Sequence, residues 1–224
     1  VPPEVFTTEF KNPAGGAEFR NNMREAVKLF EAAGWTQKSG KLVNAAGETL
    51  KAEFLLVQPD FERIVLPYID NLKRLGVEAT ARIVDTSQYK RRTDDFDFDI
   101  VIDNFGQSHS PGNEQRDYWH SESAKRPGSQ NAIGIEDKAI DTLVDRVIAA
   151  TNREDLVAAT RALDRVLLWN FFVVPQWYYP FDRIAHWDVF GRPEKAPSQS
   201  PASVLQTWWI DPARQAAVKS ATGR

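Results

Sequence analysis

One polar stretch of the chain carries residue types that commonly do chemistry, in the order Asp103, Ser108, His109 and Glu114. A nucleophilic serine needs a base that a third group aligns, and a histidine next to Ser108 in the sequence does not give that geometry by itself. Zinc could be bound by His109, Glu114 and His120, but their spacing matches no HExxH-type motif. Catalysis and metal binding are the less favoured alternatives, and we expect no catalytic residue, metal ion or cofactor. A solvated loop and a ligand-binding loop are the main alternatives for this stretch.

Four aspartates stand just before this stretch, and two of them alternate with phenylalanines. The sequence FDFDIVI, residues 96–102, has the period of two that is typical of a half-buried strand. Asp97 and Asp99 are therefore predicted to share one face. A glycosidase needs two carboxyl groups about 5–9 Å apart, a separation that such neighbours approach. We expect a solvated strand face, and a carbohydrate-active hydrolase that uses Asp97, Asp99 or Glu114 is the alternative.

Tryptophan is frequent, with seven among 224 residues. A single tryptophan is more often a core residue than part of a binding site, but together these residues suit a cleft that accepts flat or amphipathic groups. Several aromatic residues fall in predicted loops or at strand ends: Trp119, Trp177, Tyr178, Tyr179, Trp208 and Trp209. The pair Gly15-Gly16 is no phosphate loop, because it lacks the following lysine and the preceding strand.

The elements before the polar stretch must position it. Apolar residues at 50–57 predict a strand that is buried on both faces, and a helix capped by Asp60 follows. Pro67 lies within the helical pattern and predicts a kink or an early break. The alternating residues 77–84 predict a second strand and hence a right-handed βαβ unit. If strand 96–102 joins this sheet in parallel, the polar stretch leaves its carboxyl end, where α/β sheets bind ligands.

Other segments also have clear patterns. The remaining predicted elements are helices at 20–33, 140–148 and 152–167, a hairpin at 35–47 and a strand at 171–179. Asn152 is the expected N-terminal cap of the last helix, and Gly34 stands where a left-handed C-terminal cap belongs. Pro175 interrupts the last strand, which favours a sheet edge or a bulge for it.

Composition excludes several classes of protein. The chain has 28 basic and 31 acidic residues, a net charge of −3 and no basic stripe, so we expect no nucleic-acid partner. No apolar run approaches the roughly 18 residues of a membrane span. Zero cysteine excludes disulfides and thiolate metal sites. The chain begins Val1-Pro2-Pro3, which we interpret as the start of a processed or trimmed piece.

After Pro180 the chain has only short apolar clusters, around Trp187 and Trp209. The segment GRPEKAPSQSP, with three prolines, lies between them. This tail has no evident core of its own. We therefore expect it to pack on something else, either the preceding domain or a part of the protein beyond this sequence.

The order of these pieces resembles a known family. The blocks are REAVKLFEAAGW, LKAEFLLVQPDFERIVLPYIDNLKRLGVEATARIVDTSQYKRRTDDFDFDIVI, IDTLVDRVIAATNREDLVAATRALDRVLLWNFFVVPQWY and WWIDPAR. They resemble the C-terminal part of bacterial extracellular solute-binding proteins of the peptide and oligopeptide type that serves ABC importers. The YejA-like branch is the most similar. The resemblance covers nearly the whole chain from about residue 20, and the joint order of the blocks is far more specific than any one block.

The resemblance implies a periplasmic, two-lobed binding protein that is not an enzyme. This chain would supply the α/β C-terminal lobe, with a mixed, mostly parallel sheet flanked by helices. Residues 1–19 would form a lead-in and hinge segment, 20–179 the lobe, and 180–224 a returning segment that packs on the N-terminal lobe of the same protein. The implied partners are a peptide or modified-peptide ligand and the membrane permease of the importer. A sensory protein that presents its ligand to a membrane receptor would differ only in partner.

In this family the segment after the DFDIVI-like strand lines the ligand cleft. The resemblance thus implies ligand contacts from Asp103, Asn104, Phe105, Gly106, Gln107, Ser108 and His109, with Trp119 and Trp177. Dipeptide and oligopeptide binders carry an acidic residue here that pairs with the free α-amine of the ligand. Counting back from Pro111, the matching position is Gln107, and Asp103 could replace the acid only in a shifted loop. A blocked or modified peptide is therefore a possible ligand.

Overall fold

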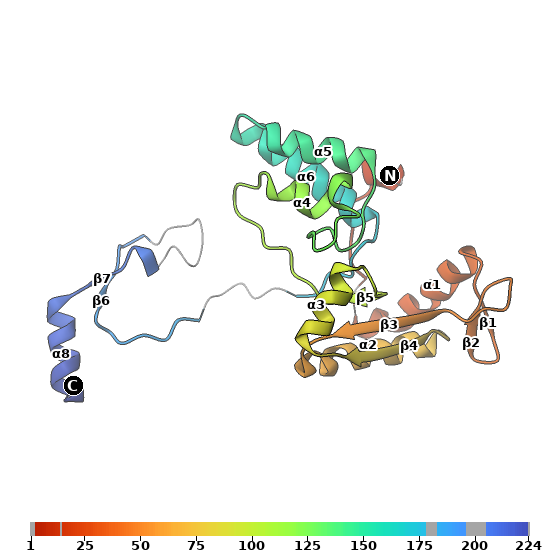
Figure 1. Cartoon of the computed structure of the whole chain (residues 1–224), viewed down its shortest axis with the longest axis horizontal. Coiled ribbons are helices and arrows are strands. Elements are labelled where there is room, and N and C mark those ends of the chain that lie inside the picture. The colour runs from red at the N-terminus through yellow and green to blue at the C-terminus, as the bar shows by residue number, and fades with distance from the viewer. Residues whose placement is uncertain (1–2, 14, 178–182, 196–204, 224) are drawn as a thin grey trace. The chain divides into compact units, whose positions relative to one another are not determined.

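The computed structural model describes residues 3–13, 15–177, 183–195 and 205–223. The chain folds into two compact units (Figure 1). The first combines Val1–Phe105 with Gly112–Val173, and the second combines Gly106–Pro111 with Val174–Arg224. The polar stretch after residue 102 is thus divided between the two units. The domain boundaries expected at residues 20 and 180 stay predictions.

The first unit contains a three-stranded sheet whose strands all run parallel. β3 (Lys51–Leu56) is central, between β4 (Glu78–Ile83) and β5 (Ile100–Val101). Phe54, in the second half of β3, pairs with both neighbours. The predicted α/β fold with a mostly parallel sheet is confirmed, and so is the expectation that the third strand joins the sheet in parallel.

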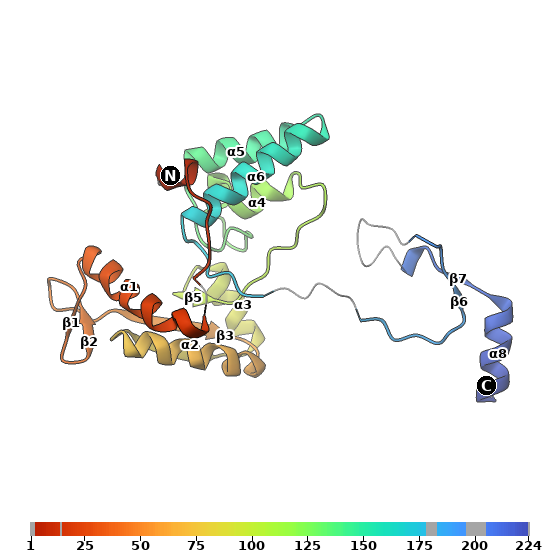
Figure 2. The ribbon, with the colours of Figure 1, turned by 180° about the vertical axis from the view of Figure 1, so that it is seen from behind.

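Helices α1 (Phe19–Ala32) and α2 (Glu62–Arg74) lie on the side of this sheet that faces the viewer in Figure 2. α2 begins after a 3-10 turn at Pro59–Phe61, and Phe61 precedes it without a side-chain cap, so the predicted cap by Asp60 is wrong. The helix also continues through Pro67. A buried apolar face holds it against the strands, and the core here consists of Leu42, Phe54, Leu56, Val65, Ile69, Val77 and Ala79.

The predicted hairpin is present as β1 (Thr36–Lys38) and β2 (Lys41–Val43). It lies against the end of α2, where the Leu42 backbone nitrogen donates to Gly76 O at 2.7 Å. Gly76 has φ +92°, and an added Cβ there would lie 2.7 Å from Leu42 N. Only glycine fits this position, because a side chain would meet backbone in a left-handed conformation.

The strand predicted at 96–102 is wrong over its first half. Strand β5 has only two residues, and the polar segment before it forms α3 (Thr86–Asp94), which the periodicity did not predict. Phe96 takes a φ of +57° in the turn after α3. The Arg92 side chain holds that turn, since its Nε donates to both the backbone oxygen and the carboxylate of Asp97, at 2.9 and 2.8 Å.

The rest of the first unit is helical. α4 (Glu114–Trp119), α5 (Lys138–Ala149) and α6 (Arg153–Trp169) share a core made of Val5, Trp119, Ile135, Ile140, Val144, Val147, Leu163 and Val166. The last two helices and the cap by Asn152 are confirmed, since Asn152 Oδ1 accepts from the backbone nitrogen of Asp155 at 2.9 Å. The N-terminal segment belongs here too, because Arg165 donates to Val5 O and Thr8 O.

The second unit contains a two-stranded antiparallel pair and a helix. These are β6 (Phe190–Gly191), β7 (Trp209–Ile210) and α8 (Pro212–Thr222). The strand predicted at 171–179 is absent from its described residues, 171–177, and Tyr178 and Tyr179 lie outside the described part of the chain.

Candidate functional site

In the strand order β4-β3-β5, successive strands are added on opposite sides of β3. The chain steps from β3 to β4 and then returns across β3 to β5. Open α/β sheets bind ligands at such a switch point, beyond the carboxyl ends of the strands. Gln58 follows β3 at this edge, Asp85 follows β4 after one residue, and Asp103 follows β5 after one residue. The candidate site is the edge between β3 and β5, where the polar stretch begins.

Asp103 and Tyr89 are the polar pair at this edge. Asp85 Oδ1 accepts from the backbone nitrogen of Gln88 at 2.9 Å and so starts α3, which carries Tyr89. Burial raises the pKa of Tyr89, and the negative charge of Asp103 raises it further. Asp103 is exposed, and its Oδ1 accepts from the backbone nitrogen of the exposed Asn104 at 2.8 Å. The pair can offer a hydroxyl donor and a carboxylate acceptor to a polar ligand.

Phe105 turns from this edge into the helical core. Its ring centroid lies 4.6 Å from that of Trp119 and 5.8 Å from that of Tyr118, with interplanar angles of 45° and 86°. Such tilted and edge-on pairs are the favoured aromatic geometries. Trp119 is only 7% exposed. The structure thus brings two predicted site residues together, and Trp119 supports Phe105 from within the core.

Hydrogen bonds hold the other end of the polar stretch. Glu114 Oε1 accepts from the backbone nitrogen of Gly112 at 2.8 Å and from Gln115 Nε2 at 3.2 Å. Gln115 is buried, and its Oε1 accepts from Trp119 Nε1 at 3.0 Å. Burial alone would raise the pKa of Glu114, but the hydrogen bonds outweigh it and the pKa is lowered. Glu114 is therefore an ionised acceptor of hydrogen bonds and is not suited to donate a proton.

The other predicted site residues belong to the second unit. They are Gly106, Gln107, Ser108, His109 and Trp177, and all are exposed. Ser108 Oγ accepts from the backbone nitrogen of Ser110 at 3.2 Å, a local turn of the kind that serine favours. Their part in ligand binding stays a prediction.

The carboxylates considered for hydrolysis stabilise the sheet and its turns. Asp97 pairs with Arg92, and Asp99 Oδ2 accepts from the backbone nitrogen of Glu53 in β3 at 2.9 Å. Both aspartates precede β5, so the prediction that they share a strand face is wrong. Nothing in this arrangement favours the hydrolase alternative.

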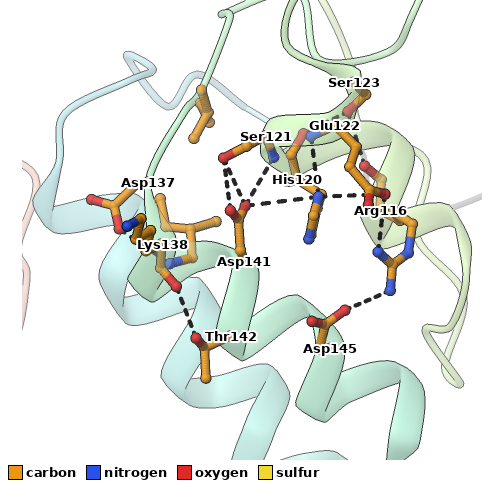
Figure 3. A network of polar contacts seen from close by, with 12 residues as sticks. Arg116, His120, Ser121, Glu122, Ser123, Asp137, Lys138, Asp141, Thr142 and Asp145 are labelled. Carbon is orange, nitrogen blue, oxygen red and sulfur yellow. Dashed lines mark hydrogen bonds and ion pairs between the residues drawn. The ribbon is translucent and has the colours of Figure 1, made fainter.

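A polar network joins the end of α4 to α5 (Figure 3). Asp141 accepts from the backbone nitrogen of Ser121 at 2.8 Å and from its hydroxyl at 2.8 and 3.0 Å. His120 Nδ1 accepts from the backbone nitrogen of Glu122 at 3.1 Å. Among the residues that the structure describes, no three His, Asp or Glu side chains are grouped to hold a metal ion.

A small cavity of about 180 Å³ opens beside this network. Its lining is polar and consists of Asn113, Arg116, Asp117, Glu122, Ser123 and Arg126. Arg116 pairs with Glu122 at 3.1 Å and with Asp145 at 2.5 Å, while Arg126 pairs with Asp117. Because these charges neutralise each other and the walls are polar, the cavity does not resemble a pocket for peptide side chains.

The sequence profile described as "Bacterial extracellular solute-binding proteins, family 5 Middle" matches residues 2–126. The chain belongs to this family. It is 50% identical over 212 residues to "Probable peptide-binding protein YejA" of Agrobacterium fabrum, covering 93% of this chain and 34% of that protein. It is 34% identical over 211 residues to "Peptidoglycan-binding protein YepA" of the same organism, covering 93% and 34%. The expected resemblance to the YejA-like branch of solute-binding proteins is confirmed.

Solved structures of other binding proteins share the fold. The oligopeptide-binding protein AppA of Bacillus subtilis, in complex with a nonapeptide, matches with a TM-score of 0.58 at 20% identity, over 65% of this chain and 29% of that chain. The chain spans about a third of the length of the two curated relatives. No helix in the described residues combines the length and the apolar character that crossing a membrane requires.

Two residues of the site were missed by sequence reasoning. Tyr89 was overlooked because α3 is polar and has no apolar period, although Asp85 before Thr86-Ser-Gln88 is a usable cap signal. Gln115 was overlooked because a glutamine beside Glu114 carries no sign of burial in the sequence. Only the fold shows that it contacts both Glu114 and Trp119.

Proposed function

We propose that the chain is part of the substrate-binding component of an ABC importer that captures peptides or modified peptides. The observation that carries the proposal is the 50% identity, over 93% of the chain, to a relative named as a probable peptide-binding protein. The edge with Asp103, Tyr89 and Phe105 supports it, because open α/β sheets bind ligands there. On this proposal the protein is periplasmic, delivers its ligand to a membrane permease and is not an enzyme.

The proposed ligand contacts are the exposed residues of the polar stretch and one aromatic residue, namely Asp103, Asn104, Gly106, Gln107, Ser108, His109 and Trp177. Phe105 and Trp119 would act by holding this stretch in place. Backbone groups of an irregular segment can pair with a peptide backbone whatever its side chains. A site of this kind would accept many peptide sequences.

The residue at position 107 bears on how the amino end of the ligand is recognised. Gln107 stands where related peptide binders are expected to have an acid, and a neutral amide does not compensate the charge of a free amine. We therefore propose a ligand whose amino end is acylated or otherwise modified. The relative named as a peptidoglycan-binding protein supports this choice, because the peptides of peptidoglycan are amide-linked to sugar at their amino ends.

The proposed mechanism is closure of two lobes about a hinge. Ligand contacts to both lobes favour the closed form, and the ligand shifts this equilibrium only by its differential affinity for that form. A micromolar affinity corresponds to about −8 kcal/mol. Backbone hydrogen bonds contribute roughly 0.5–1.5 kcal/mol each, so one wall of a cleft does not readily reach that value.

We further propose that residues 180–224 pack on the N-terminal lobe, in the part of the protein that this chain does not include. Exposed apolar side chains in the described part of this segment support the proposal. Trp187 is 63% exposed, Trp209 52% and Ile210 49%. Large apolar side chains left exposed in this way are candidates for burial against a partner surface.

Native mass spectrometry of the full-length protein, purified from its own host, tests the proposed function. We expect additional masses that correspond to bound peptides and that disappear after unfolding and refolding. After refolding, a synthetic library of N-acetylated peptides should give a larger fraction of peptide-bound protein than the same library with free amines. A protein that carries no peptide and accepts none from either library would contradict the proposal.

A further inference from the structure

We infer that Gln115 is a positioning residue: together with Glu114 and Trp119 it holds both ends of the ligand-binding segment on α4. Hereafter the three side chains are called the clamp. The inference rests on the proposed function, since the clamp affects activity only if the segment between Phe105 and Gly112 binds the ligand.

The clamp holds the first end of the segment through aromatic contact. Phe105 leaves β5 and packs its ring on Trp119, at a centroid distance of 4.6 Å. Trp119 is the last residue of α4 and belongs to the helical core. The backbone at Phe105 therefore moves only if the tryptophan or its core moves with it.

The second end is held through a hydrogen bond. The Gly112 backbone nitrogen donates to Glu114 Oε1 at 2.8 Å. The lowered pKa of Glu114 shows that its ionised form is favoured, and ionised acceptors make the stronger hydrogen bonds. Glu114 is the first residue of α4.

Gln115 connects the two ends through one amide group. Its Nε2 donates to Glu114 Oε1 at 3.2 Å, while its Oε1 accepts from Trp119 Nε1 at 3.0 Å. The residue is only 4% exposed, so water cannot readily replace either bond. A primary amide is the side chain that both donates and accepts in this way. Asparagine would be one methylene too short, and glutamate would lose the donor.

The segment between the two ends has no regular secondary structure of its own. Residues Gly106–Ser110 are exposed and form neither helix nor strand. Each residue of an irregular segment loses conformational entropy when a ligand orders it. Fixing both ends removes part of that loss before the ligand arrives, which raises affinity without adding a contact.

The test uses the full-length protein with the substitution Gln115→Met, which keeps the length of the side chain and removes both hydrogen bonds. We expect the backbone amide of Gly112, whose hydrogen bond to Glu114 the clamp supports, to exchange hydrogen at least 10-fold faster, with α5 and α6 unchanged. We expect the Kd for the peptide that wild type binds to rise about 10-fold. Trp119→Phe keeps a ring and removes the indole N–H. It should give a similar but smaller effect, and combining it with Gln115→Met should add little.

The matched control is Ser121→Ala. It removes the two hydroxyl contacts to Asp141 just beyond the C-terminal end of α4 and leaves the clamp side chains unchanged. This variant should keep wild-type exchange at the Gly112 amide and a wild-type Kd. Equal losses of affinity in Ser121→Ala and Gln115→Met, or unchanged exchange in both clamp variants, would overturn the inference.

The exchange measurement needs no ligand, so it tests the clamp even if the proposed function fails. A wild-type protein that binds no peptide would contradict the proposed function alone. A wild-type protein that binds peptide, together with clamp variants of unchanged exchange and Kd, would contradict the clamp alone.

Discussion

Substituting Asn131 with leucine should destabilise the first unit strongly. Asn131 is 1% exposed, and its side chain makes three hydrogen bonds within the loop that follows α4. Its Nδ2 donates to His120 O at 3.2 Å and to Ile135 O at 3.1 Å, and its Oδ1 accepts from the Ile135 backbone nitrogen at 2.9 Å. Leucine has nearly the same size and can make none of these bonds.

The size of the stability loss depends on which hydrogen bonds the partners of Asn131 keep in the variant. His120 O still accepts from the Ser123 hydroxyl at 2.8 Å, so it does not lose all its partners. Ile135 is 2% exposed, and within the described part of the chain neither of its backbone groups has another partner. Two buried unpaired groups cost about 1–3 kcal/mol each, and the apolar leucine offsets part of this. We expect a net loss of about 2–4 kcal/mol, from which we estimate a decrease in Tm of about 5–15 °C.

Thermal unfolding followed by circular dichroism at 222 nm measures this loss. Asn21→Leu is the matched control, because Asn21 is an exposed residue of α1 whose side chain forms hydrogen bonds with the exposed side chains of Glu18 and Arg24. We expect that variant to change stability by no more than about 0.5 kcal/mol. Equal Tm values for the two leucine variants would refute the account of the loop after α4.

Two further predictions concern other parts of the chain. An added Cβ at Gly191 would lie 2.4 Å from the Trp209 ring, so Gly191→Ala should shift the indole NMR signal of Trp209, whereas Gly15→Ala, in open space, should leave it unchanged. Asp103→Asn should lower the pKa of Tyr89 toward its ordinary value near 10, leaving only the effect of burial, as measured by NMR titration. Because the folded pKa of Tyr89 is raised, its neutral hydroxyl stabilises the fold below pH 10, and this contribution is lost as the pH rises through the folded pKa. An unchanged Tyr89 titration in Asp103→Asn would contradict this electrostatic effect.

The sheet could be predicted because its signals are local. Strands 50–57 and 77–84 and the helix between them follow from apolar periodicity and from Gly76. The third strand was predicted correctly as part of the sheet, but its predicted range, 96–102, is longer than β5. The alternating residues FDFD belong to a turn, in which Phe96 has a positive φ. Periodicity does not distinguish such a turn from a strand.

Two other elements depended on information that the sequence does not carry locally. Helix α3 is held by one cap and by the contacts of Arg92 with Glu53 and Asp97, which are tertiary. The segment 171–177 has the β-branched and aromatic residues of a strand, but it pairs with no other strand in the described part of the chain. Strand propensity depends on such pairing.

For the candidate site, the predicted topology identified the loop after β5. It could not identify the residues of α3 and α4 that interact with this loop. The loop after β5 was expected because ligands bind at the carboxyl ends of parallel strands. The electrostatic effect of Asp103 on Tyr89 and the hydrogen bond of Gln115 with Trp119 join residues whose proximity no local pattern indicates.

The central claim is that this chain supplies one wall of a peptide cleft and that the remaining part of the protein supplies the other. Isothermal titration of one peptide, chosen from those that co-purify with the full-length protein, into the full-length protein and into the 224-residue chain in parallel tests it directly. The account predicts micromolar or tighter binding to the full-length protein and at least 100-fold weaker binding to the chain. Equal affinities for the two would contradict it.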